Sequence, residues 1–300
     1  MRFITAVSLL LVVNSPALGQ RVGDRRFDPV TGDYHVWIMN DSLQLIEMRV
    51  VPPNKVLASV ATKIQPGRLG PLRYSYVVKV LEGTRQPLWL VEIDCPVSSR
   101  MEAVSAVAMH NGVKQRWNFY QVGKPGSTVL HHRCEADWRD ALPAGGTLEV
   151  GLETMLLPVI GEVRLYGATG GVSWPTSDPI LENERASLVV DSLSGGDGGW
   201  KAVAAPVPGR DPVTVTSVAQ GVSMIQSDLD RACGDLGWIS SAAVCGRLRK
   251  SLEQATLRVF LAELAGQHSP AGNSPVNDAA FWLLKVNAEF VLGLIPRSSH

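Results

Sequence analysis

The chain has 300 residues, of which 45% are hydrophobic, and its 28 basic and 28 acidic residues give a formal net charge of zero. This balance argues against nucleic acid or an anionic membrane as the partner, because phosphate groups are bound by a surplus of Lys and Arg. The length is enough for one large domain or two ordinary ones, with a sizeable hydrophobic core.

The N-terminus has the pattern of a signal peptide. Arg2 precedes the apolar run Ile4–Val13, and the small residues of Ala17-Leu18-Gly19 follow. The apolar run is too short to span a bilayer, which needs about twenty residues. We therefore expect residues 1–19 to be removed and the chain from Gln20 onward to be secreted or periplasmic. No later apolar run reaches membrane-spanning length, so no membrane span is expected after signal cleavage.

Residues 20–192 have the composition and spacing of β-strands. Tyr74–Val80 is rich in β-branched and aromatic residues, which favour strands. Asn111-Gly112 is the strongest hairpin signal, because a type I′ turn requires positive φ at both central residues. Its predicted arms are Val104–His110 and Val113–Val122. Short strands with frequent turns and no helical run between them predict an antiparallel Ig-like β-sandwich.

The composition changes after residue 192. Ser194–Gly199 is rich in glycine, and Pro206, Pro208 and Pro212 follow. Glycine confers flexibility and proline removes backbone donors, so we interpret residues 193–214 as a linker.

Residues 215–296 then show the period of helices. Apolar positions predict a first helix around Met224–Ala232, a second over Ala243–Leu264 and a third over Asp278–Leu294. Asn277 is a plausible N-cap for the third helix, since its side-chain oxygen can accept from first-turn amides. The predicted fold class is thus mixed, an Ig-like β-sandwich followed by a small three-helix module.

Four cysteines are present, Cys95, Cys134, Cys233 and Cys245. In an exported protein an even number of cysteines indicates disulfides. Four cysteines allow three pairings, and the sequence does not fix which one forms. Pairing within each module, Cys233 with Cys245 and Cys95 with Cys134, is the arrangement we expect.

Several short motifs resemble those of exported, uncharacterised bacterial proteins with a β-sandwich and a C-terminal disulfide-tied helical module. In the helical region they are Cys233–Ile239, Val244–Leu248, Phe260–Leu264 and Ala280–Glu289, and in the β region Tyr74–Val78 and Leu142–Leu148. The resemblance implies an exported bacterial protein of two modules. It brings no known activity or catalytic residue with it.

His131 and His132 are the candidate metal ligands, because neutral imidazoles bind zinc or copper. Adjacent residues on a strand point to opposite faces, so a single metal ion would require a turn at this pair. A surface or edge-strand role for the two histidines is therefore the favoured interpretation, and a metal-assisted hydrolase is the alternative.

Trp138 and Trp174 lie in loop-like segments and are the candidate platform for a carbohydrate, because sugar rings stack on exposed aromatic faces. Trp89 and Trp117 lie in predicted strands, where we expect them to fill the core. A carbohydrate-binding module is thus a further alternative.

Catalytic motifs give no positive signal. The sequence has no G-x-S-x-G elbow, no H-E-x-x-H and no phosphate-binding glycine loop. Asp228 and Asp230, two apart on a predicted helix, do not face each other and are expected on a solvated surface. We expect no cofactor and a non-enzymatic binding or structural role, with an extracellular or envelope protein or polysaccharide as the partner.

Overall fold

The computed structural model describes residues 19–66, 71–95, 102–122, 133–168, 183–195, 200–253, 257–269 and 274–294. The chain forms two compact units, one made of Met1–Pro52 with Thr169–Gly199 and the other of Pro53–Ala168 with Trp200–His300. Residues 1–18 of the predicted signal peptide lie outside the described part.

The smaller unit is a three-stranded antiparallel sheet with one helix. Helix α1 (Glu184–Gly195) buries Ala186 and Val190, one turn apart, against the sheet core of Val36, Ile38 and Val50. The sequence assigned this whole region to the sandwich and did not predict the helix. Its Val189-Val190 pair favours strands locally, and packing against the sheet overrides that preference. The strands, in spatial order, are β1 (Arg25–Asp28), β2 (Asp33–Met39) and β3 (Leu45–Val50).

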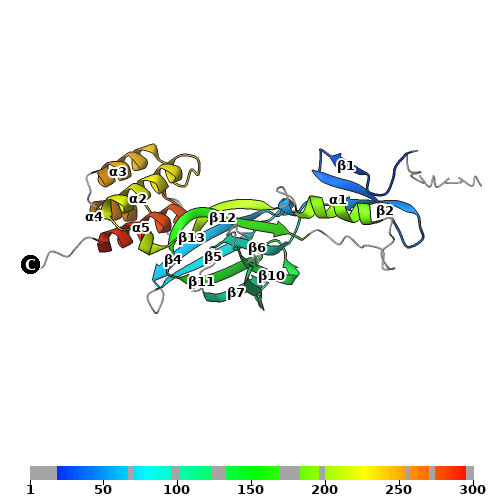
Figure 1. Ribbon diagram of the computed structural model, residues 1–300, viewed down its shortest axis with the longest axis horizontal. Coiled ribbons are helices and arrows are strands. Elements are labelled where there is room, and N and C mark those ends of the chain that lie inside the picture. Colours follow the sequence, from blue (N-terminus) through cyan, green and yellow to red (C-terminus); the bar gives the residue numbers. More distant parts are fainter. Residues whose placement is uncertain are drawn as a thin grey trace, which may run out of the picture. The chain divides into compact units, whose positions relative to one another are not determined.

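The larger unit contains two five-stranded antiparallel sheets (Figure 1). The strand order is β4-β5-β11-β7-β8 in one sheet and β13-β12-β6-β10-β9 in the other. The predicted antiparallel β region is therefore confirmed. The strands are β4 (Ala58–Pro66), β5 (Leu72–Val80), β6 (Leu88–Asp94), β7 (Glu102–His110), β8 (Val113–Arg116), β9 (Asn118–Val122), β10 (Arg133–Leu142), β11 (Thr147–Thr154), β12 (Leu157–Gly167) and β13 (Lys201–Arg210).

The two sheets pack on one hydrophobic core. Alternate residues of each strand face inward, as Val78 of β5 does from one sheet and Ile93 of β6 from the other. The buried Tyr76 hydroxyl donates to the carbonyl oxygen of Pro206 in β13 at 3.0 Å. This bond crosses the core and joins the two sheets, so a polar group that is costly to bury has its partner.

The Asn-Gly hairpin is confirmed. Asn111 and Gly112 have φ of 49° and 78°, as a type I′ turn requires, and His110 pairs with Val113. The second arm is shorter than predicted, because β8 ends just before Trp117 and β9 belongs to the other sheet. Trp117 is 2% exposed and fills the core where the chain changes sheets, whereas Trp89 of β6 is 39% exposed, so the expectation that it fills the core is wrong.

The proline-rich stretch expected to be a linker contains β13, and the linker prediction is wrong for residues 201–210. Within its sheet β13 is an edge strand that pairs with β12. Pro206 and Pro208 lack an N–H group, which an edge strand tolerates because one side of it has no ladder. Gly161 of β12 admits the Val207 side chain, since a Cβ on Gly161 would lie 2.3 Å from Val207 Cγ2.

The described part of the C-terminal region contains four helices rather than three (Figure 1). The predicted helix over Ala243–Leu264 is divided into α3 and α4, and this lets both apolar stripes, with Leu248 and Phe260, reach one core. The third predicted helix is present as α5 and begins at the predicted residue, and the Asn277 cap is confirmed, because its Oδ1 accepts from Ala280 N at 2.9 Å. The helices are α2 (Val218–Cys233), α3 (Ala242–Glu253), α4 (Leu257–Gly266) and α5 (Asp278–Leu294).

A disulfide joins Cys233 at the end of α2 to Cys245 of α3, which confirms that predicted pair. Cys95 is also disulfide-bonded. The Cys134 side chain lies outside the described part of the chain, so the pairing of Cys95 with Cys134 remains a prediction. None of the helices in the described ranges has the length and apolarity needed to cross a membrane.

Helix α5 joins the helical layer to the sandwich. Leu284 and Ala288 pack in the helical core, whereas Val286 belongs to the core of the sandwich. Asn287 is fully buried and donates from Nδ2 to the carbonyl oxygen of Pro158 in β12 at 3.1 Å. The helices and the sandwich, which the sequence suggested as separate modules, thus share one compact unit.

Gly221 of α2 allows this helix to lie close to α5. A Cβ at that position would lie 2.3 Å from Cγ2 of Val291. We expect Gly221→Ala to lower the free energy of unfolding by about 1–3 kcal/mol, because overpacking outweighs the gain in helix propensity. Gly246 of α3 is exposed and has no atom within 4 Å of such a Cβ. Gly246→Ala should therefore raise the free energy of unfolding by about 0.5–1 kcal/mol.

Urea unfolding of these two variants measures the difference. We expect the free energy of unfolding to be lower in Gly221→Ala and higher in Gly246→Ala than in the native protein. A Gly221→Ala variant as stable as Gly246→Ala would contradict the close approach of α2 and α5.

Candidate binding site

Most of the site residues predicted from the sequence lie outside the part of the chain that the structure describes. His131, His132 and Trp174 lie outside the described residues, and Trp138 lies on β10 with its side chain not described. The metal site and the carbohydrate platform therefore remain predictions. Among the described residues, no group of three or more His, Cys, Asp and Glu side chains is placed to hold a metal ion.

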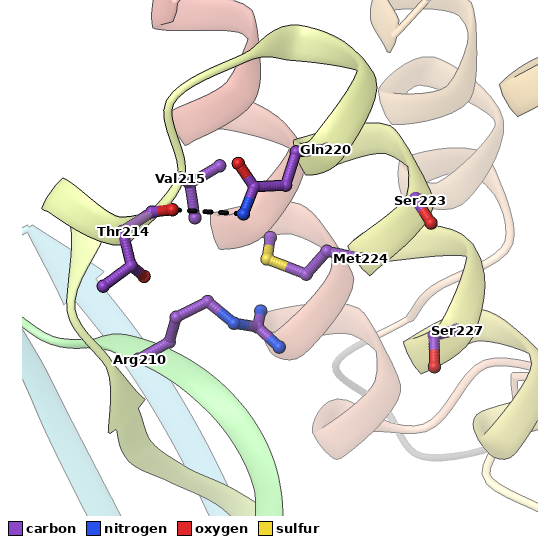
Figure 2. Close-up of a pocket in the computed structure, with 7 residues that line it drawn as sticks. All are labelled: Arg210, Thr214, Val215, Gln220, Ser223, Met224 and Ser227. Atoms are coloured by element: carbon purple, nitrogen blue, oxygen red, sulfur yellow. Dashed lines mark hydrogen bonds between the residues drawn. The ribbon is translucent and has the colours of Figure 1, made fainter.

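A polar hollow lies where β13 ends and α2 begins (Figure 2). Asp211-Pro212 turns the chain between them. The Asp211 carboxylate accepts from Val213 N at 3.1 Å, and the Thr214 hydroxyl donates to the Asp211 carbonyl oxygen at 2.7 Å. Pro212 lies at the first position of the short 3₁₀ helix that follows, η3 (Pro212–Thr214), where the missing N–H costs nothing. These bonds fix the path of the chain around the hollow.

The first turn of α2 is capped on the same side. Ser217 Oγ accepts from Gln220 N at 3.2 Å, so Ser217 is the N-cap. The Gln220 amide reaches back, accepting from Thr216 N at 3.0 Å and donating to the Thr214 carbonyl oxygen at 3.1 Å. This variant of a capping box holds the wall of the hollow between η3 and α2 in place.

The hollow has a volume of about 340 Å³. Figure 2 shows the Arg210 side chain extending from β13 toward Met224, while Ser223 and Ser227 follow one another along α2. Both serines are exposed, whereas Val215 is buried and forms an apolar part of the lining. The lining residues are Arg210, Thr214, Val215, Gln220, Ser223, Met224 and Ser227. The site therefore combines one cation, side-chain hydroxyls and a small apolar wall.

Arg210 differs from Arg164 in its partners. Arg164, for comparison, has carboxylate oxygens of Glu92, Asp94 and Glu162 within 3.6 Å. No carboxylate of the described residues lies within 4 Å of an Arg210 side-chain nitrogen, and its buried Nη1 has no hydrogen-bond partner among them. Burying a guanidinium N–H group without an acceptor costs free energy. A ligand that supplies an acceptor would recover this cost, so the group is available for binding.

Asp228 follows the lining residue Ser227 on α2 and forms a buried polar pair with Asn287. It is 7% exposed and accepts from Asn287 Nδ2 at 3.2 Å. Burial raises the pKa of Asp228 to about 6, although the positive charges of Arg210 and Arg231 act in the opposite direction. A buried carboxyl with a raised pKa is typical of functional sites, because burial otherwise costs stability.

The expectation that Asp228 lies on a solvated surface is wrong, whereas Asp230 is exposed and pairs with Arg249 at 2.8 Å. The helical period could have predicted the burial of Asp228, because it lies three residues after the buried Ile225 and four before the buried Ala232, on the same face of the helix. Arg210 has no comparable signal, because the sequence places it in the supposed linker.

No model of a known protein family matches the sequence, and no curated protein matches it either.

Proposed function

We propose that this chain is an exported, non-enzymatic binding protein of the cell envelope or the extracellular space. Export is supported by the signal-peptide pattern of residues 1–19 and by the disulfide between Cys233 and Cys245, since disulfides persist outside the reducing cytoplasm. The single observation that carries the binding role is the hollow at Arg210, in which a buried guanidinium donor lacks an acceptor among the described residues.

We also propose that the sandwich is Ig-like. The neighbouring strands β4-β5-β11-β7 have the arrangement of the A-B-E-D sheet of an immunoglobulin domain, and β6-β12-β13 that of its C-F-G sheet. The remaining strands β8, β9 and β10 come between D and E in the chain. The fold is used by many binding proteins, but this is an analogy of architecture and identifies no ligand.

The position of the hollow fits a binding role. One wall comes from the end of β13 in the sandwich and the other from α2, which the disulfide and the packing of α5 hold in place. A site on rigid elements loses little conformational entropy when a ligand binds. The sandwich would thus serve as the support, and the edge at β13 and α2 as the place of recognition.

A thermal-shift screen of the chain from Gln20 onward tests the proposal. The panel contains small organic acids, soluble polysaccharides, divalent metals and EDTA, since a compound that binds the folded state raises the melting temperature. We expect at least one class of organic compound to raise it, the compound being recovered unchanged. Conversion of the compound into a product would contradict a non-enzymatic role, and silence across the whole panel would contradict the hollow as the binding site that carries the proposal.

The same screen separates the two alternative sites. A zinc or copper shift that EDTA reverses, and that His131→Ala or His132→Ala abolishes, would favour the metal site. A polysaccharide shift that is lost in Trp138→Ala or Trp174→Ala would favour the carbohydrate platform.

A further inference from the structure

We infer that the hollow at the end of β13 binds the carboxylate group of a small organic acid, with Arg210 as its counter-charge. The inference rests on the proposed binding function and names the chemical class of the ligand. It is carried by the geometry of the hollow, the unsatisfied donor of Arg210 and the charges around it.

The guanidinium is the group that selects an anion. Arg presents its N–H donors in a planar fork that matches a carboxylate, and hydrogen bonds between charged groups are about twice as strong as neutral ones. The buried Nη1 of Arg210 has no acceptor among the described residues, and the guanidinium lines the hollow. An oxyanion in the hollow would satisfy this donor. A neutral ligand would leave the positive charge without a close partner.

The local charge favours a monoanion over a dianion. Asp228 already interacts electrostatically with Arg210, and the exposed carboxylate of Asp211 lies next to Arg210 in the chain. Arg231 also acts on Asp228, but it is paired with Asp235 at 3.8 Å. A second negative charge on the ligand would be repelled by these carboxylates, and within a Debye length such repulsion is only partly screened by salt. A carboxylate is therefore favoured over a doubly charged phosphate.

The lining of the hollow fits a short carbon chain attached to that carboxylate. Val215 is buried and Met224 is half-buried, and both line the hollow together with Arg210 (Figure 2). Methionine adapts its shape to small apolar groups. Ser223 and Ser227 add hydroxyl groups at the exposed side of the hollow.

The experiment is an NMR titration of the ¹⁵N-labelled chain from Gln20 onward with butyrate, acetate and inorganic phosphate. Sodium chloride at matched ionic strength is the control for screening. We expect saturable shifts of the α2 amides between Gly221 and Ser227, with a dissociation constant several-fold lower for butyrate than for acetate. Phosphate should bind more weakly than either. Shifts no larger than those in chloride would overturn the inference.

Three variants localise the effect. Arg210→Met should abolish the saturable shifts, and Arg210→Lys should weaken binding about tenfold, because lysine keeps the charge but loses the planar fork. Arg258→Met is the matched control, since Arg258 is exposed on α4 and its loss changes the net charge equally. Equal weakening by Arg210→Met and Arg258→Met would overturn the inference.

The Asp228→Asn variant tests the inference through a gain of affinity rather than a loss of affinity. Removing the competing carboxylate should strengthen butyrate binding at least about threefold, because one repulsive charge near the site disappears. Unchanged or weaker binding in a folded Asp228→Asn variant would contradict the role of Arg210 as counter-charge.

Failure of this inference is distinguishable from failure of the proposed function. If a neutral compound from the thermal-shift screen shifts the same α2 amides and butyrate does not, the hollow is a binding site but not one for carboxylates. If no compound shifts any amide, the hollow does not bind ligands, and the observation that carries the proposed binding function fails.

Discussion

Asp228→Asn is expected to raise the free energy of unfolding by about 2–3 kcal/mol at pH 8 and to have little effect at pH 4. The pKa of Asp228 is raised by burial to about 6 in the folded protein, above the usual 3.8 of an aspartate. Above pH 6 the carboxylate is ionised in both states, and its burial destabilises the folded one. As the pH falls from about 7 toward 4, the folded state takes up the proton first and this cost disappears. Asparagine removes the cost at every pH and still accepts from Asn287 Nδ2.

Urea unfolding at a series of pH values measures this effect. Asp230→Asn is the matched control, because Asp230 is exposed two residues away and loses an ion pair with Arg249 that is worth about 1 kcal/mol at most. A variant Asp228→Asn that is less stable than the native protein at pH 8 would show that the ionised carboxylate stabilises the fold, contrary to this account.

Loss of the disulfide between Cys233 and Cys245 is expected to lower the free energy of unfolding by about 3 kcal/mol, from the entropy of the closed loop. The two cysteines are 12 residues apart and link the end of α2 to α3. Because α5 packs on β4, β12 and β13, the loss should lower the unfolding transition of the sandwich together with that of the helices. Thermal unfolding followed by far-UV circular dichroism tests this, since one transition at a lower temperature is expected rather than separate transitions of the helices and the strands.

The single variants provide the control for this prediction. Cys233→Ala and Cys245→Ala remove the same bond, so each should cost nearly as much as the double variant. Additive losses would mean that the cysteines act through their individual packing rather than through the bond.

The elements that could be predicted from the sequence are those defined by local chemistry. Asn111-Gly112 specifies a type I′ turn wherever two strands meet, and Asn277 supplies a cap to the helix that begins with Asp278. The Cys233–Cys245 bond also joins residues close in sequence. In each case the feature is determined by a few residues that lie close together in the sequence.

The elements that were missed depend on distant partners. Pro206 and Pro208 suggest a linker when the sequence is considered alone. They are compatible with a strand because β13 forms the edge of its sheet. The division of α3 from α4 is imposed by a core that both must reach. The candidate site was missed for two reasons: Arg210 lies in the supposed linker, and Asp228, which interacts with it, lies on a helix face that was expected to be solvated.

Native-state hydrogen exchange of the full chain tests the central claim most directly, namely that the helices and the sandwich form one unit with the hollow at their junction. The slowest amides of α5, around Ala288, and of β12, around Val163, should exchange with the same free energy and the same dependence on denaturant as global unfolding. Exchange of the α5 amides through a separate opening of lower free energy would contradict the claim, because the helical layer would then detach from the strands that support it.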